Sequence, residues 1–169
     1  MIHSESSIDI DANDPIGQYW RASTDYAGTF VPFETYAYDI ITDLNHGTQG
    51  YVEWCSILSN KGQPNPYNNF NSAPVLINPE TDEVIYTPQY YLLSHFSKFI
   101  RPNAQRIGLK GEEVKGLIYT AAKNTDGSIA VVVYNNNEAV YDLSIVLGNE
   151  TYTTQIAPKA IQTIHLRSK

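Results

Sequence analysis

The sequence contains little cysteine, tryptophan or methionine, and it has few basic residues. Cys55 is the only cysteine among 169 residues, which excludes a disulfide within the chain. The four histidines lie far apart and form no Cys/His cluster of the kind that binds zinc, so we expect no metal site. The net charge is −7, and Lys and Arg form no run, which argues against a nucleic acid as partner.

Long hydrophobic runs are also missing. No stretch reaches about 18 consecutive apolar residues, and the first residues lack the charged-then-apolar pattern of a signal peptide. Hydrophobic residues make up 42% of the chain and charged residues 17%, which is typical of a folded protein. The length suits one ordinary domain but falls short of a complete barrel of about 250 residues. We therefore expect one domain, or a part of something larger.

Tyrosine, by contrast, is abundant, with 13 residues. It is common in strands and on sugar-binding surfaces, because its ring packs on apolar faces while its hydroxyl still finds a partner. Asn149-Glu150-Thr151 is a glycosylation sequon, which is compatible with a secretory route.

The first 100 residues read as an α/β arrangement. Apolar residues at helical spacing predict a helix over 32–46, and a buried strand is expected over 51–58. Residues 59–73 are dense in Asn, Gly and Pro, which predicts a long loop. The remaining expected elements are extended segments over 75–77 and 83–86 around a turn, and a helix over 89–100.

The apolar period changes to two from Lys115 onward. Such close spacing of strands predicts an antiparallel sandwich or half of one. The fold class is therefore α/β followed by all-β, with the change near Asn103. The expected strands cover 116–124, 129–136, 141–148, 151–157 and 161–167, with a hairpin turn at 125–128.

Chemistry in parallel α/β folds is located after the carboxyl ends of the strands. This rule assigns Glu5, the residues after Trp54, and the loop through Asn69 and Phe70 to the candidate functional face. The residues alone leave alternatives open. Glu5 can be an exposed terminal charge, Trp54 a core residue, and the Glu53 carboxylate either buried or directed to solvent.

Several stretches, taken together, resemble glycoside hydrolase family 30, the family of the acid glucosylceramidases. The stretch APVLINPETDEVIYTPQYYLLSHFSKFIRPNAQRIG, residues 73–108, is similar to the family's segment between barrel and sandwich, and HFSKFIRP is its most specific part. Residues 50–54 resemble the eighth barrel strand, and NTDGSIAVVVYNNNEAV resembles a hairpin of the sandwich. The resemblance covers nearly the whole chain.

The resemblance implies a fold and a set of site residues. Residues 1–102 would form the last two strands and helices of a TIM (β/α)8 barrel, and residues 103–169 a β-sandwich domain. Glu5, preceded by a serine, would be the catalytic nucleophile. Trp54 would be the sugar platform, and Glu53, Asn69 and Phe70 would line the glucose pocket.

The activity implied is retaining hydrolysis of the β-glucosidic bond of glucosylceramide, for which two carboxylates suffice without a cofactor. The second carboxylate, the acid/base, is expected on a barrel strand before residue 1, so the chain is expected to be the C-terminal part of an enzyme and inactive alone. The family also implies a lysosomal or secreted location, and a glycolipid or other β-glucoside as substrate. It leaves room for contact with a membrane surface or an activator protein.

Some positions depart from the family's pattern. Cys55 stands where asparagine is frequent, Glu53 where aspartate is common, and Pro66-Tyr67 replace a tryptophan. These departures leave the aglycone open. The alternatives are an inactive or sugar-binding remnant, and a polysaccharide-cleaving glucanase or xylanase of the same family.

Overall fold

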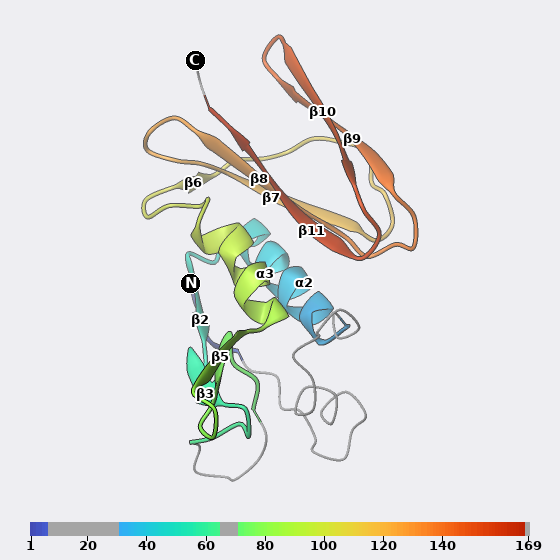
Figure 1. Ribbon diagram of the computed structural model, residues 1–169. Helices are drawn as coiled ribbons and strands as arrows, with labels where there is room; N and C mark the ends of the chain where they lie inside the picture. The colour runs from blue at the N-terminus through green and yellow to red at the C-terminus, as the bar shows by residue number, and fades with distance from the viewer. Residues whose placement is uncertain (7–30, 65–70, 168–169) are drawn as a thin grey trace. The chain divides into compact units, whose positions relative to one another are not determined.

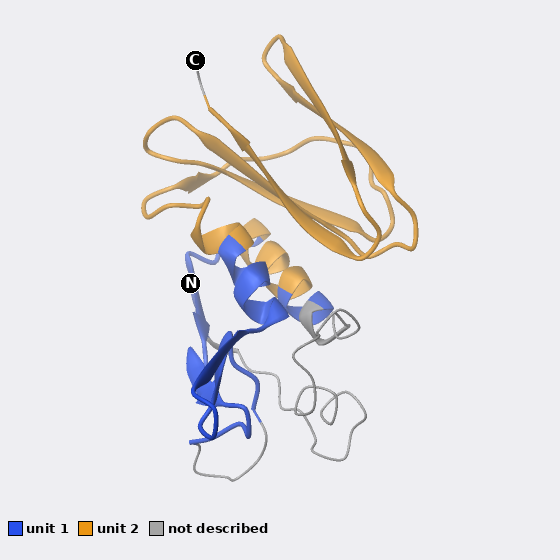
Figure 2. Ribbon diagram, in the orientation of Figure 1, with its two compact units in different colours: residues 1–36, 46–94 blue, residues 37–45, 95–169 orange. Residues whose placement is uncertain are grey.

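The structure is a computed structural model that describes residues 1–6, 31–64 and 71–167. The chain divides into two compact units (Figure 2), of which unit 1 comprises residues 1–36 and 46–94 and unit 2 residues 37–45 and 95–169. Helices α2 (Val31–Asn45) and α3 (Pro88–Ser97) each contribute residues to both units. The bounds of α2 confirm the expected first helix, whereas α3 ends three residues before the predicted end.

Unit 1 contains a parallel strand pair, β1 (Ile2–Ser6) and β2 (Gly50–Glu53). Parallel neighbours need a long crossover, and α2 lies in the sequence between them, so the described elements follow the order β1-α2-β2. Gly47, with φ of +91°, follows the helix at a backbone conformation that suits glycine.

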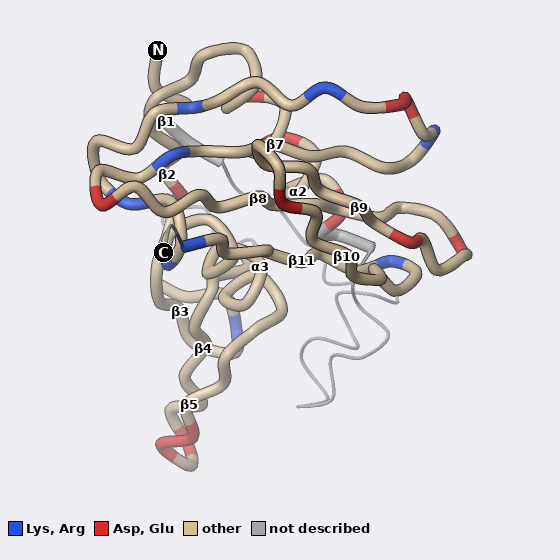
Figure 3. The backbone as a smooth tube through the Cα atoms, turned by 90° about the horizontal axis from the view of Figure 1, so that it is seen from above, with Lys and Arg blue, Asp and Glu red and all other residues tan. Residues whose placement is uncertain are grey.

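The second sheet of unit 1 has three strands, β3 (Ile57–Ser59), β4 (Val75–Asn78) and β5 (Glu83–Tyr86). Strand β4 is parallel to β3 and antiparallel to β5, and acidic residues gather at the β4–β5 turn (Figure 3). The extended segments at 75–77 and 83–86 are thus confirmed. The prediction of a single buried strand over 51–58 was wrong. Strand β2 pairs with β1 whereas β3 pairs with β4, and a bend at residues 54–56 separates β2 from β3.

Unit 2 contains the two sheets of the predicted sandwich (Figure 1). The strand order is β11-β8-β7-β6 in one sheet and β10-β9 in the other, and all their pairings are antiparallel. The five expected strands are confirmed. The short β6 was missed, since two residues cannot show an alternating pattern. The bounds are β6 (Gln105–Arg106), β7 (Leu117–Lys123), β8 (Ile129–Asn135), β9 (Tyr141–Leu147), β10 (Glu150–Ile156) and β11 (Ala160–Leu166).

Strand β8 is the centre of the unit 2 core. Val131 and Val133 on one face belong to an apolar cluster with Ala121 of β7 and Ile156 of β10. The intervening residues Ala130, Val132 and Tyr134 are buried as well. A strand covered on both faces reads as a continuous apolar run, which explains the sequence IAVVVY. Strand β9 alternates instead between half-buried and exposed residues, because only one of its faces is covered.

The β7–β8 hairpin turn was predicted correctly, and its buried Asn124 does more than close the turn. The Asn124 N–H donates to Ser128 O at 2.8 Å, and Gly127 takes the positive φ of +84° that the turn requires. The Asn124 side chain also accepts from Arg101 N–H and donates to Phe99 O, both at 2.9 Å. It thereby fixes the segment that follows α3.

Candidate active site

The carboxyl ends of β1 and β2 bring two candidate residues to the same edge of a sheet. In the parallel ladder His3 pairs with Tyr51 and Ser6 pairs with Glu53, so three steps along β1 match two along β2. This irregularity falls at Ser4 and Glu5. Bulges bend a strand and redirect a side chain, and they are over-represented next to active sites. The backbone of Glu5 therefore lies beside the end of β2, one residue before the partner of Glu53.

Glu53 is the most perturbed titratable group in the described part of the chain. The Tyr36 hydroxyl of α2 donates to Glu53 Oε1 at 3.0 Å, and Oε2 is buried. Burial disfavours the charged form and raises the pKa of Glu53 to about 7, although the hydrogen bond from Tyr36, the amide of Gln89 and the charge of His3 oppose it. A carboxyl with this pKa changes charge near neutral pH, as functional carboxyls often do.

Aromatic rings of unit 1 form a group that includes Tyr36, the hydrogen-bond donor to this carboxyl. The His3 ring lies 4.8 Å from the Tyr51 ring, and Tyr51 meets Tyr36 edge-on with centroids 6.4 Å apart. Sequence reasoning missed His3, which was considered only with the other histidines as a metal ligand, and it assigned Tyr36 no part in the site. The pattern did carry one signal for Tyr36. It lies four positions before the buried Ile40, and therefore on the same face of the helix, and it is itself 2% exposed.

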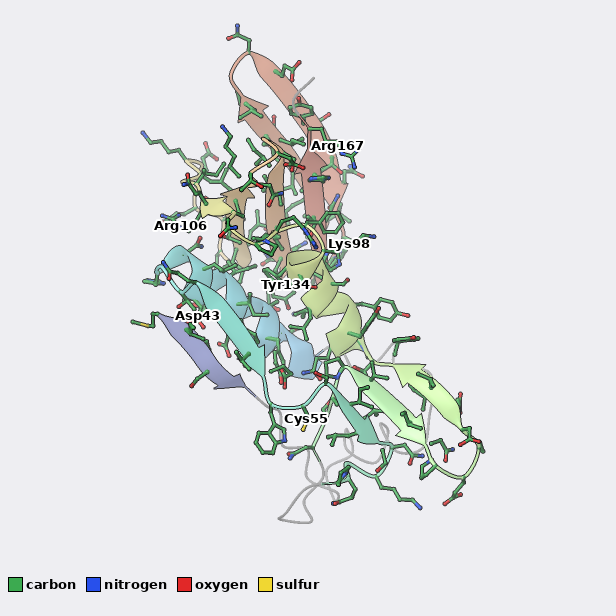
Figure 4. The ribbon with its side chains drawn as sticks, turned by 90° about the vertical axis from the view of Figure 1, so that its left-hand side faces the viewer. Asp43, Cys55, Lys98, Arg106, Tyr134 and Arg167 are labelled. Carbon is green, nitrogen blue, oxygen red and sulfur yellow. The ribbon has the colours of Figure 1, made fainter. Side chains whose placement is uncertain are left out.

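Trp54 lies in the bend after β2 and is 40% exposed, so it is not the core residue that its apolar surroundings suggest. Cys55 follows it in the same bend (Figure 4). Burial and the nearby Glu53 raise the pKa of the Cys55 thiol, which keeps it protonated at neutral pH. An exposed indole beside a half-buried carboxyl gives this edge both an apolar platform and a hydrogen-bonding group.

Asn69 and Phe70, the other predicted pocket residues, lie outside the described residues. The chain that follows them, Asn71 to Pro74, is buried. The buried Thr87 hydroxyl lies 3.0 Å from both Ala73 O and Pro74 O, which ties this segment to the start of α3. The segment after the loop is therefore firmly held.

In the described ranges, no three His, Cys, Asp or Glu side chains come together in a way that could hold a metal ion. None of the described helices is long and apolar enough to cross a membrane.

Comparison with known proteins identifies the family. The model of the glycosyl hydrolase family 30 TIM-barrel domain matches residues 10–100, and that of the family 30 beta-sandwich domain matches residues 103–164. The chain belongs to glycoside hydrolase family 30. Its fold is accordingly the C-terminal part of a family 30 barrel followed by an antiparallel β-sandwich, as the sequence predicted.

Curated family 30 relatives include lysosomal acid glucosylceramidase of Mus musculus, 36% identical over 128 residues, which are 76% of this chain and 25% of the relative. Putative glucosylceramidase 4 of Caenorhabditis elegans is 32% identical over 161 residues, 90% of this chain and 30% of the relative. The chain thus spans between a quarter and a third of the length of these relatives.

Solved structures show the same fold. SrfJ from Salmonella typhimurium matches with a TM-score of 0.81 at 22% identity, over 99% of this chain and 35% of that chain. An endo-beta1,6-glucanase matches with a TM-score of 0.79 at 23% identity, over the same shares of the two chains. At such identities the likeness concerns the fold alone.

The raised pKa of Glu53 predicts a pH-dependent stability of this family 30 chain. Below pH 4.5 the carboxyl is protonated in both the folded and the unfolded state. Between pH 4.5 and about 7 the unfolded state releases its proton while the folded state keeps it, so the free energy of unfolding falls as the pH rises. One pKa unit equals about 1.4 kcal/mol, and allowing for partial exposure we expect a loss of about 2 kcal/mol.

Urea unfolding between pH 4 and pH 8 measures this loss. Glu53→Gln is the control, because an amide cannot titrate, and its free energy of unfolding should lack this component of the fall. Equal pH dependence of the two proteins would show that Glu53 titrates alike in both states.

Proposed function

We propose that this chain supplies the nucleophile and part of the sugar pocket of a retaining β-glucosidase that hydrolyses glucosylceramide to glucose and ceramide. The observation that carries the proposal is the irregular end of β1, which falls at Glu5 next to the end of β2 with Glu53 and the exposed Trp54. The names of the curated relatives, at 32% and 36% identity, support the choice of substrate.

In this mechanism Glu5 attacks the anomeric carbon as the bond to the ceramide oxygen breaks, which forms a glycosyl-enzyme ester. A second carboxylic acid protonates the leaving oxygen, and its carboxylate then takes a proton from the water that hydrolyses the ester. We place that acid/base outside residues 1–169, about 5–5.5 Å from Glu5 in the assembled site. The two carboxylates do this chemistry without a metal or an organic cofactor.

The other proposed residues bind the sugar. The Trp54 indole offers an apolar face to the C–H face of the glucose ring, and the carboxyl of Glu53 bonds to sugar hydroxyls. Asn69 and Phe70 complete the pocket. The same proposal includes a lysosomal or secreted location, as the family implies. Because the substrate is a lipid, it also includes contact of the full-length protein with a membrane surface or an activator protein.

A substrate panel tests this function. For the full-length protein we expect kcat/KM for glucosylceramide to exceed that for β-glucan and xylan oligosaccharides by roughly a hundredfold or more, since a pocket that pairs sugar hydroxyls strongly rejects unmatched substrates. Preference for an oligosaccharide would make the protein a polysaccharide-cleaving member. Absence of all turnover in the full-length protein would favour an inactive or sugar-binding remnant.

The 169-residue chain, assayed alone, tests the placement of the acid/base. We expect no turnover of glucosylceramide, because one carboxylate cannot act as both nucleophile and acid/base in this mechanism. Turnover by the isolated chain would contradict an acid/base outside it.

A further inference from the structure

A line of polar side chains crosses the interior of unit 1 from α2 to the segment after the 59–73 loop. Tyr36 donates to Glu53 Oε1 at 3.0 Å, and the Ser72 hydroxyl donates to Gln89 Oε1 at 3.2 Å. Gln89, the acceptor of the second pair, lies at the start of α3 and is 0% exposed. A fully buried amide is rare unless its hydrogen bonds have a structural or functional purpose.

The contact with Ser72 determines which way the Gln89 amide faces. Because the hydroxyl of Ser72 occupies Oε1, the NH2 group is directed to the other side. Gln89 Nε2 and Glu53 Oε2 are both buried, and neither has a hydrogen-bond partner of regular geometry among the described residues. The Gln89 amide and the backbone N–H of Trp54 are both near enough to favour the ionised form of Glu53. A buried donor of Gln89 and a buried acceptor of Glu53 thus lie near each other, and each still needs a partner.

We propose that Gln89 is a positioning residue, whose amide holds the carboxyl of Glu53 in place for the sugar hydroxyls and couples it to the segment of residues 71–74. This inference rests on the proposed function, since it takes Glu53 to be a sugar-binding residue. Ser72 lies two residues after Phe70, so the amide links the carboxyl at the end of β2 to the segment after the proposed Asn69-Phe70 side of the pocket. Thr87, two residues before Gln89, anchors the same segment through Ala73 O and Pro74 O.

The other groups that act on Glu53 come from three neighbouring segments. His3 of β1, Tyr36 of α2 and the backbone N–H of Trp54 all favour the charged carboxylate, and Cys55 of the bend feels its charge in return. The hydrogen bond from Ser72 to Gln89 joins the loop segment to this group of residues.

Two substitutions separate positioning from simple support of the fold. Gln89→Met keeps the length of the side chain and removes both hydrogen bonds. Gln89→Glu, when protonated, keeps one donor and one acceptor, but when ionised it places a second negative charge beside Glu53. Gln105→Met is the matched control, because Gln105 is exposed in β6.

Kinetics of the full-length protein on glucosylceramide give the first readout. At pH 5 we expect Gln89→Met to raise KM about tenfold with little change in kcat, because a lost hydrogen bond to a binding group weakens ground state and transition state alike. Gln89→Glu should resemble the parent protein at pH 5 and approach the KM of Gln89→Met near pH 7. Equal KM values for all variants and the Gln105→Met control would overturn the proposal, as would a KM for Gln89→Glu that does not change with pH.

Titration of Glu53 by carboxyl-carbon NMR gives a second readout that does not depend on turnover. We expect the pKa of Glu53 to rise above its parent value in Gln89→Met and to stay unchanged in Gln105→Met. An unchanged pKa in Gln89→Met would refute the contact between amide and carboxyl. A shifted pKa in a protein that cleaves no β-glucoside would instead refute the proposed function and leave the contact standing.

Discussion

Replacing Glu5 with Gln is expected to lower kcat of the full-length protein on glucosylceramide by roughly 10³-fold or more, because an amide cannot form the glycosyl-enzyme ester. Substrate binding should persist, since the amide has nearly the shape of the carboxyl. The measurement is kcat and KM for both proteins at the pH optimum. Glu112→Gln, at an exposed position in unit 2, is the matched control and should keep parent activity.

A slow fluorinated glucoside tests the same assignment by chemistry. The substrate should leave a covalent sugar on the enzyme, and peptide mass spectrometry should locate that sugar on Glu5. A label on any other carboxylate, or full activity of Glu5→Gln, would show that β1 does not carry the nucleophile.

Asn135→Ala is expected to cost about 4 kcal/mol of the free energy of unfolding. The Asn135 side chain is 0% exposed and donates to Ala139 O at 2.8 Å and to Ala157 O at 2.9 Å. It also accepts from Asn137 N–H at 3.0 Å. Truncation leaves two carbonyls and one N–H without this partner, and each buried orphan costs about 1–3 kcal/mol.

Denaturant unfolding of the chain measures this cost, with Asn149→Ala as the control. Asn149 is exposed in the β9–β10 turn, so its truncation should change stability by less than about 0.5 kcal/mol. A loss below about 1 kcal/mol for Asn135→Ala would mean that water replaces the side chain in the β8–β9 and β10–β11 connections.

The sequence was most informative where one chemical pattern decided the structure. The alternating strands of unit 2 and the Asp126-Gly127 turn could be predicted because local side chains determine which face is buried and where the chain reverses. The split between β2 and β3 could not, since YVEWCSIL is mostly apolar and aromatic and has no Gly, Pro or Asn to mark a break. Only the pairing of each half with a different strand shows that the chain bends at Trp54.

The residues of the candidate site also fall into those that the sequence could predict and those that only the structure shows. The rule of strand ends pointed to Glu5 and to the residues after Trp54. The resemblance gave Glu5, Glu53 and Trp54 their roles in the catalytic scheme, and these roles remain predictions. The buried environment of Glu53 depends on Tyr36 and Gln89, which are 17 residues before it and 36 after it in sequence. A single sequence offers no periodic signal for such a contact, because hydrophobic spacing shows which face of a helix is buried but not which polar groups meet there. The irregularity at Ser4 and Glu5 is likewise visible only from the register of two paired strands.

The two sheets of unit 2 differ in how firmly their strands are held. Strand β8 has a hydrogen-bonded neighbour on each side, whereas β9 and β10 have only each other in the described part of the chain. A two-stranded hairpin is marginal by itself and depends on the apolar contacts of its inner face. Local opening should therefore begin at the β9–β10 hairpin, which can separate from the core while the β7–β8–β11 ladder stays closed. Unit 2 thus combines a stable sheet with a hairpin that opens at a lower free energy.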